Sequence, residues 1–128
     1  TDFIRMALDN GSIDMMTDGK EEREFLYAQD CCEALETVMN NYSDFNSNDE
    51  LHVTSFSSIK IIDIAQIIQQ KFSMIGKKID IKPSIDTDTV QQNSKNVASK
   101  YLTNWWKPTT SLDDGIAKVF ASMKKNYD

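Results

Sequence analysis

An arginine within a short aromatic and acidic run is the residue whose type and surroundings point most directly to chemistry. Arg23 lies in the sequence EREFLY, residues 22–27. The planar guanidinium of arginine binds phosphate or carboxylate groups through paired N–H donors. The preceding Asp18-Gly19 favours a tight turn, because glycine adopts positive φ without steric cost. We therefore expect Arg23 at the start of a strand beside a turn, where it binds an anionic ligand or pairs with a neighbouring glutamate.

The other potentially reactive or metal-binding residues form no pattern of a site. His52 is the only histidine, and we interpret it as a strand residue because it lacks the partners of a metal site or a catalytic pair. The adjacent Cys31-Cys32 have no further cysteine to pair with, so we expect free thiols and a reducing environment. Trp105-Trp106 is interpreted as an anchor of the closing loop rather than as a stacking surface. We predict no metal site, because one acidic cluster is split between a loop and a helix cap: Asp86, Asp88, Asp113 and Asp114.

Length and charge narrow the class of protein. The chain has 128 residues, enough for one domain, and a formal net charge of −6. This charge argues against a nucleic-acid-binding protein, because no basic surface would neutralise phosphates. No apolar run approaches the roughly 20 residues of a membrane-spanning helix. No signal peptide is recognisable and the first residue is Thr1 rather than Met, so we expect a fragment excised from a longer cytoplasmic protein.

A helix and a hairpin are expected to position Arg23. Apolar residues at helical spacing predict a helix over residues 2–9, ended by Asn10-Gly11. Residues 13–16 and 23–27 are predicted as two strands that pair in a hairpin around Asp18-Gly19.

A second helix follows the expected hairpin. It is predicted to begin at Asp30, with Glu33 as the reciprocal partner of a capping box, and to extend over residues 31–39. Its apolar residues are expected to be buried: Ala34, Leu35 and Val38.

Short strands and amphipathic helices alternate in the rest of the chain. Ser57 or Ser58 is expected to cap the most regular helix, which Gly76 ends, and Ser111 with Asp114 forms a second capping box. The predicted segments are a strand at 51–55, a helix that buries Ile61, Ile62, Ile64, Ala65, Ile68 and Phe72, a strand at 79–81 closed by Pro83, a polar loop at 84–93, a short helix capped by Ser94 with Val97, Ala98, Tyr101 and Leu102, and a last helix lined by Leu112, Ile116, Val119, Phe120 and Met123. The order α-ββ-α-β-α-β-α-α describes a mixed α/β (α+β) fold, mainly helices with short strands.

The run from Gly19 to Ala34 resembles the carboxy-terminal half of the NAD-dependent epimerase/dehydratase family, the extended short-chain dehydrogenases that act on nucleotide sugars. The shared pattern is G-x-x-x-R-[DE]-F-[IL]-Y-x-x-D-x-x-x-A. Two further patterns follow in the family's order: S-I-x-x-x-x-I-A-x-x-I from Ser58, and W-x-P-x-x-S-L-x-x-G-I from Trp106 to Ile116. The resemblance implies the small substrate-binding domain of such an enzyme, without its Rossmann cofactor domain.

This resemblance also implies roles for particular residues. Arg23 would contact the nucleotide diphosphate, the expected hairpin residues Ile13, Asp14 and Met15 would approach the nucleotide and sugar, and Asp88 would accept a hydroxyl. Three positions depart from the family. Ile85 stands where relatives often carry a second phosphate-binding arginine, Glu24 replaces an aspartate, and Trp105 replaces a glycine.

The family's cofactor and catalytic motifs are missing from this chain. The four glycines, at positions 11, 19, 76 and 115, are too far apart for a dinucleotide-binding turn. No tyrosine has a lysine four residues later, so the catalytic Tyr-x-x-x-Lys pattern is absent. We therefore expect that the intact enzyme uses NAD or NADP and that this fragment alone binds no cofactor and is inactive.

Two functions from different classes follow. The first is the nucleotide-sugar-binding portion of an NAD(P)-dependent epimerase, dehydratase or reductase, whose nucleotide and sugar the residues leave open. The alternative is a non-catalytic binding or assembly module that keeps the fold without the cofactor half. In either case the strand at 51–55 would have an unpaired edge, so we expect a homodimer or another strand-mediated self-association.

Overall fold

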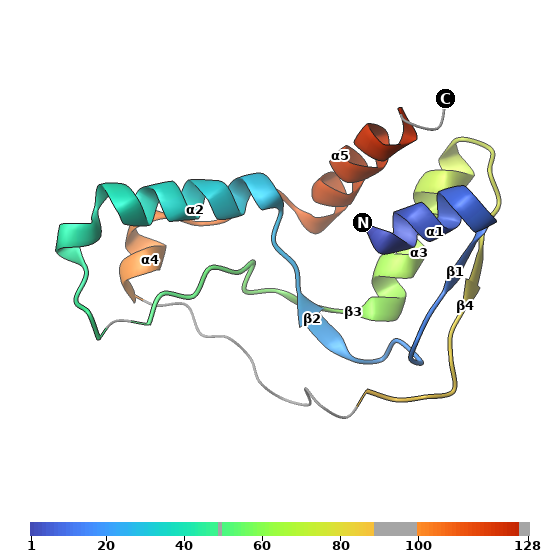
Figure 1. Ribbon diagram of the computed structural model, residues 1–128, viewed down its shortest axis with the longest axis horizontal. Helices are drawn as coiled ribbons and strands as arrows, with labels where there is room; N and C mark the ends of the chain where they lie inside the picture. Colours follow the sequence, from blue (N-terminus) through green and yellow to red (C-terminus); the bar gives the residue numbers. More distant parts are fainter. Residues whose placement is uncertain (49, 89–99, 126–128) are drawn as a thin grey trace. The chain divides into compact units, whose positions relative to one another are not determined.

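The structure of the chain, a computed structural model, describes residues 1–48, 50–88 and 100–125 (Figure 1). Its elements follow the predicted order, with one additional 3₁₀ helix. They are α1 (Asp2–Asn10), β1 (Ser12–Asp14), β2 (Glu22–Glu24), α2 (Ala28–Asn40), η1 (Tyr42–Asp44), β3 (Ser58–Lys60), α3 (Ile61–Met74), β4 (Asp80–Lys82), α4 (Lys100–Trp105) and α5 (Leu112–Lys124). The described residues form two compact units. Unit 1 contains residues 1–23, 59–88 and 113–125, and unit 2 contains residues 24–48, 50–58 and 100–112.

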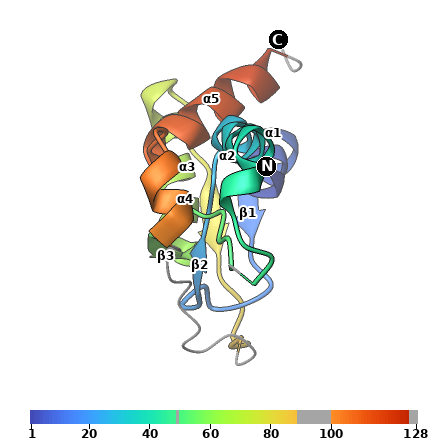
Figure 2. The same cartoon turned by 90° about the vertical axis from the view of Figure 1, so that its left-hand side faces the viewer.

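Unit 1 is built on a parallel pair of strands, β1 and β4, which lie side by side in Figure 1. Ile13 is opposite Ile81 in the register. Helix α1 packs against β1, and α3 packs against β4. Helix α5 lies beside α3 (Figure 2), where the rings of Phe72 and Phe120 meet edge to face with centroids 4.9 Å apart. The buried apolar side chains of this unit are Ile4, Ala7, Ile13, Met15, Ile64, Ala65, Ile68, Phe72, Ile79, Ile116 and Phe120.

Several predicted elements of unit 1 are confirmed. Helix α1 ends at Gly11, which has a φ of 67° and donates its N–H to the carbonyl of Ala7 at 3.1 Å. The left-handed conformation explains why a glycine follows this helix. Strand β4 lies at the predicted position directly before Pro83, and α3 buries four of the residues assigned to its apolar face: Ile64, Ala65, Ile68 and Phe72.

Unit 2 centres on a cluster that joins α2 and α4. Ala34, Leu102 and Trp106 are its buried members, and Leu26, Val38, Leu51 and Val53 pack around them. Trp106 is therefore an anchor, as predicted, whereas Trp105 is partly exposed. The prediction that Leu35 is buried is wrong, because this side chain lies on the outer face of α2 and is 53% exposed.

Asp30 has a different role from the predicted helix cap. Helix α2 begins two residues earlier, at Ala28, with Tyr27 at the N-cap position and no side-chain cap. The Asp30 carboxylate is only 1% exposed. It accepts hydrogen bonds from the N–H of Thr110 at 2.9 Å and from the hydroxyls of Thr109 and Thr110 at 3.2 and 3.1 Å. Asp30 therefore holds the start of α2 to the segment that precedes α5.

The predicted hairpin is wrong. β1 pairs with β4, and β2 pairs with β3 in a separate two-stranded sheet, so the two segments around Asp18-Gly19 have different partners. Gly19 does adopt positive φ, at 74°, but the turn does not bring β1 and β2 together as neighbouring strands.

The predicted strand at residues 51–55 is also wrong, because these residues have no regular secondary structure. Thr54 is buried and donates its hydroxyl to Glu24 at 2.7 Å, and Phe56 has a φ of 54°. The strand lies instead at β3. The proposed self-association therefore loses the unpaired strand on which it was based.

Some predictions lie outside the described residues, namely the cap at Ser94, the side chains of Val97, Ala98 and Tyr101, and the loop beyond Asp88. In the described ranges, no helix combines the length and the apolar character that crossing a bilayer requires.

Candidate functional site

The segment between β1 and β2 is held along the segment that follows β4. The N–H of Met15 donates to the carbonyl of Lys82 at 2.9 Å, and the N–H of Ser84 donates to the carbonyl of Thr17 at 3.0 Å. The N–H of Asp18 donates to the carbonyl of Asp86 at 2.7 Å. The two chain segments thus continue side by side beyond the β1–β4 pair. Arg23 follows the first of these segments, and Asp88 follows the last contact of the second.

The segment between β1 and β2 also caps the N-terminus of α3. The first two N–H groups of this helix, from Ile61 and Ile62, donate to the carbonyls of Glu21 and Gly19 at 3.1 and 3.0 Å. The first N–H groups of a helix have no partner inside the helix and must be satisfied from outside. Backbone carbonyls therefore cap the N-terminus of α3. The prediction that Ser57 or Ser58 caps this helix is wrong, because α3 has no side-chain cap.

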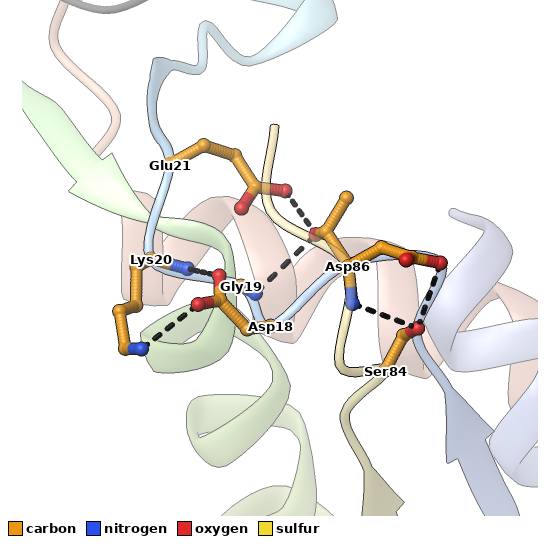
Figure 3. A network of polar contacts seen from close by, with 7 residues as sticks. Asp18, Gly19, Lys20, Glu21, Ser84 and Asp86 are labelled. Atoms are coloured by element: carbon orange, nitrogen blue, oxygen red, sulfur yellow. Dashed lines mark hydrogen bonds and ion pairs between the residues drawn. The ribbon is translucent and has the colours of Figure 1, made fainter. Parts of the chain in front are cut away.

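Polar side chains further order this segment (Figure 3). The Thr17 hydroxyl donates to Glu21 Oε1 at 2.5 Å and accepts the N–H of Gly19 at 3.3 Å. Lys20 Nζ lies 2.8 Å from Asp18 Oδ2, and the side chain and backbone of Lys20 lower the pKa of Asp18. Glu21 Oε2 is buried and has no hydrogen-bond partner in the described part of the chain.

Arg23 makes two polar contacts with its guanidinium group. Its Nη1 donates to the carbonyl of Glu22 at 2.9 Å, and its Nη2 forms an ion pair with Asp88 Oδ2. The side chains of Arg23 and Asp88 are 26% and 22% exposed. A guanidinium has five N–H donors, and these contacts within the described residues use two of them. The structure thus brings Arg23 and Asp88 together across a sequence separation of 65 residues.

The other three predicted site residues lie on β1 or directly after it. The side chains of Ile13 and Met15 are buried in the core of unit 1. Asp14 is exposed, and its carboxylate lies 3.1 Å from Lys82 Nζ and accepts the Ser12 hydroxyl at 3.1 Å. The hydrogen bonds from Lys82 and Ser12 lower the pKa of Asp14. Of these three side chains, only that of Asp14 faces solvent.

Sequence reasoning found Arg23 but not the partner that holds it. The family pattern drew attention to Asp88 as an acceptor of a ligand hydroxyl, and no local signal connects it to Arg23. Glu24, one of the expected partners of Arg23, receives the Thr54 hydroxyl.

The glycines do not fit a dinucleotide-binding turn. Such a turn lies directly before a helix, whose N-terminus faces the pyrophosphate. Gly11 follows the end of α1, Gly76 follows the end of α3, and Gly115 lies inside α5. Gly19 is held against the start of α3 by its carbonyl. In addition, no group of three or more His, Cys, Asp or Glu residues in the described ranges is arranged to hold a metal ion.

The amino-acid sequence is similar to known proteins. Residues 1–53 match the NAD dependent epimerase/dehydratase family. The chain is 30% identical over 120 residues to the GDP-L-fucose synthase of Sinorhizobium fredii (strain NBRC 101917 / NGR234), an alignment that covers 92% of this chain and 36% of the relative. The two matches together support the NAD-dependent epimerase/dehydratase family for this chain.

Solved structures show the same fold at lower identity. An epimerase from Methanothermobacter thermautotrophicus superposes with a TM-score of 0.80 at 14% identity, over 98% of this chain and 37% of that one. The dTDP-glucose 4,6-dehydratase from Bacillus anthracis, solved in complex with NAD, superposes with a TM-score of 0.75 at 18% identity, over 97% of this chain and 38% of that one. The chain therefore spans little more than a third of the length of the relatives that it matches.

Proposed function

We propose that this chain is the nucleotide-sugar-binding portion of an NAD(P)-dependent nucleotide-sugar epimerase or dehydratase. The observation that carries the proposal is the setting of Arg23. Its guanidinium is half-buried, two of its donors are held by Glu22 and Asp88, and the neighbouring backbone is tied to the segment after β4 and to α3. A guanidinium that is already oriented loses less entropy when it binds a phosphate.

In this proposal the Arg23 guanidinium binds the diphosphate. Asp14 and the backbone around Ile13 and Met15 lie toward the nucleotide, and Asp88 accepts a hydroxyl. These residues bind and orient the substrate and do not carry the chemical step. Holding the sugar in a reactive geometry is itself a large part of catalysis in such enzymes.

The proposal assigns no cofactor site and no proton transfer to these residues. The glycines present do not form a dinucleotide turn, and the sequence has no Tyr-x-x-x-Lys pattern. NAD or NADP would supply hydride transfer in an intact enzyme, while the residues around Arg23 would hold the substrate.

A titration of the chain followed by heteronuclear NMR tests this function. The ligands are UDP-, GDP-, dTDP- and CDP-sugars, with NAD as the comparison ligand. We expect shifts in residues 13–23 and at Asp88 with one nucleotide preferred. Because hydrogen bonds to charged groups contribute about 1.5–3 kcal/mol, Arg23→Gln should weaken binding roughly 10- to 100-fold.

The chain offers a matched control for this substitution. Arg5, the other arginine, lies exposed on α1 and pairs with Asp2, so Arg5→Gln changes the net charge equally without touching the site. Equal affinity of the Arg23→Gln and Arg5→Gln variants would remove Arg23 from the site. A chain that responds to no nucleotide sugar would favour the non-catalytic assembly module instead.

A further inference from the structure

We propose that Asp88 is a built-in counter-ion of Arg23, which the diphosphate of the ligand must displace before it can bind. This inference rests on the proposed function of Arg23. In the absence of ligand, the Asp88 carboxylate takes the place that an anionic ligand would occupy.

The position of the contact on the guanidinium supports displacement. Asp88 binds Nη2, whereas Nη1 donates to the carbonyl of Glu22. A guanidinium binds a phosphate with two N–H groups along its end or along its Nε side, and Nη2 belongs to both of these edges. A phosphate bound along either edge would therefore lie against the Asp88 carboxylate.

Like charges then oppose simultaneous binding. Asp88 is only 22% exposed, so water screens its repulsion of a phosphate less completely than on an open surface. Glu22 also carries a carboxylate beside Arg23, and the chain as a whole has a net charge of −6. One arginine among these acidic residues does not attract a dianion strongly unless Asp88 moves away.

The backbone around Asp88 is compatible with such a movement. The backbone hydrogen bonds that join this segment to residues 15–18 are at Lys82, Ser84 and Asp86, within the described part of the chain. Asp88 lies two residues beyond the last of them. A movement of its side chain away from Arg23 would therefore leave these three backbone hydrogen bonds in place.

The proposal predicts that removing the charge of Asp88 tightens the binding of a nucleoside diphosphate. Asp88→Asn keeps the size of the side chain and an amide oxygen for Nη2, but it removes the competing charge. Because a partly exposed ion pair contributes only modestly to the free energy, we expect the affinity to rise about twofold to fivefold. GDP, UDP, dTDP and CDP are the appropriate probes, since they lack the sugar on the β-phosphate whose hydroxyl Asp88 is proposed to accept.

Asp86→Asn is the matched control. It lies on the same segment and changes the net charge equally, but its carboxylate accepts the hydroxyl of Ser84 rather than contacting Arg23. Calorimetric titrations should show tighter binding for Asp88→Asn and almost no change for Asp86→Asn. The difference between wild type and Asp88→Asn should shrink at high salt, which screens the repulsion.

The outcomes separate this inference from the function on which it rests. If Arg23→Gln weakens binding and Asp88→Asn strengthens it, both stand. If Arg23→Gln weakens binding but Asp88→Asn also weakens it or leaves it unchanged, Asp88 orients Arg23 and is not displaced, so only the inference fails. If neither the wild-type chain nor Asp88→Asn binds any of the four nucleotides, both are wrong.

Discussion

The buried carboxylate of Asp30 should contribute strongly to the stability of unit 2. It accepts three hydrogen bonds from Thr109 and Thr110 and is 1% exposed. In Asp30→Asn one oxygen becomes an NH₂ group, which cannot accept the N–H or hydroxyl that it replaces. Hydrogen bonds to a charged acceptor contribute about 1.5–3 kcal/mol each but are not additive, so we expect a loss of about 2–4 kcal/mol.

The pH dependence of this contribution has a definite sign. Burial raises the pKa of Asp30, but the hydrogen bonds from Thr110 and Thr109 outweigh this effect, so the net pKa is lowered. A carboxyl group whose folded pKa is lowered stabilises the fold fully above its unfolded pKa of about 3.9, and this stabilisation is lost as the pH falls through the folded value. The wild-type chain should therefore lose stability below about pH 4, and the Asn variant should lack this component.

Urea denaturation followed by tryptophan fluorescence measures this effect in unit 2. Both tryptophans of the chain, Trp105 and Trp106, lie there. Asp44→Asn serves as a control, since Asp44 is an exposed acidic residue of the same unit. An Asp30→Asn variant with the urea midpoint of wild type at pH 7, or with the same loss of stability in acid, would refute the reasoning.

Two further predictions concern unit 1, and urea denaturation followed by circular dichroism checks both. Gly19→Ala should cost about 2–4 kcal/mol, since at a φ of 74° the added Cβ would lie 3.0 Å from both the backbone N and the Cβ of Ile62 and would also displace the end of the Met15 side chain. Gly11→Ala has a similar φ but open space around the Cβ, and should cost only about 1–2 kcal/mol; equal losses at the two positions would contradict the role of crowding. Phe72→Ala should cost about 3–5 kcal/mol because it leaves a cavity against Phe120, and a loss below about 1 kcal/mol would show that the core closes around the missing ring.

The regular elements of the fold were predictable from sequence where a local pattern determines them. The apolar spacing of α3 and the glycine after α1 are signals within one turn or face of a helix, and both are confirmed. The choice of strand partners is not a local property. Asp18-Gly19 correctly indicated positive φ at Gly19, but nothing near it shows that β1 pairs with β4 rather than with β2.

Polar residues were harder to place for the same reason. Asp30 has the spacing of a helix cap, yet its partners Thr109 and Thr110 lie about 80 residues away. Arg23 has glutamates on both sides, yet its ion pair is with Asp88. A short polar side chain can satisfy the same donors locally or across the fold, and only the tertiary structure decides between these possibilities.

The division of each unit into separate stretches of the chain affects both folding during synthesis and limited proteolysis. Unit 1 contains three separate stretches and unit 2 contains two. During synthesis, the contact between Phe72 and Phe120 can form only after Phe120 has been added to the chain. Contacts between distant residues slow folding, and unit 1 should reach its final packing only after residues up to Phe120 have been synthesised. By the same reasoning, no single proteolytic cut can separate either unit as an uninterrupted piece.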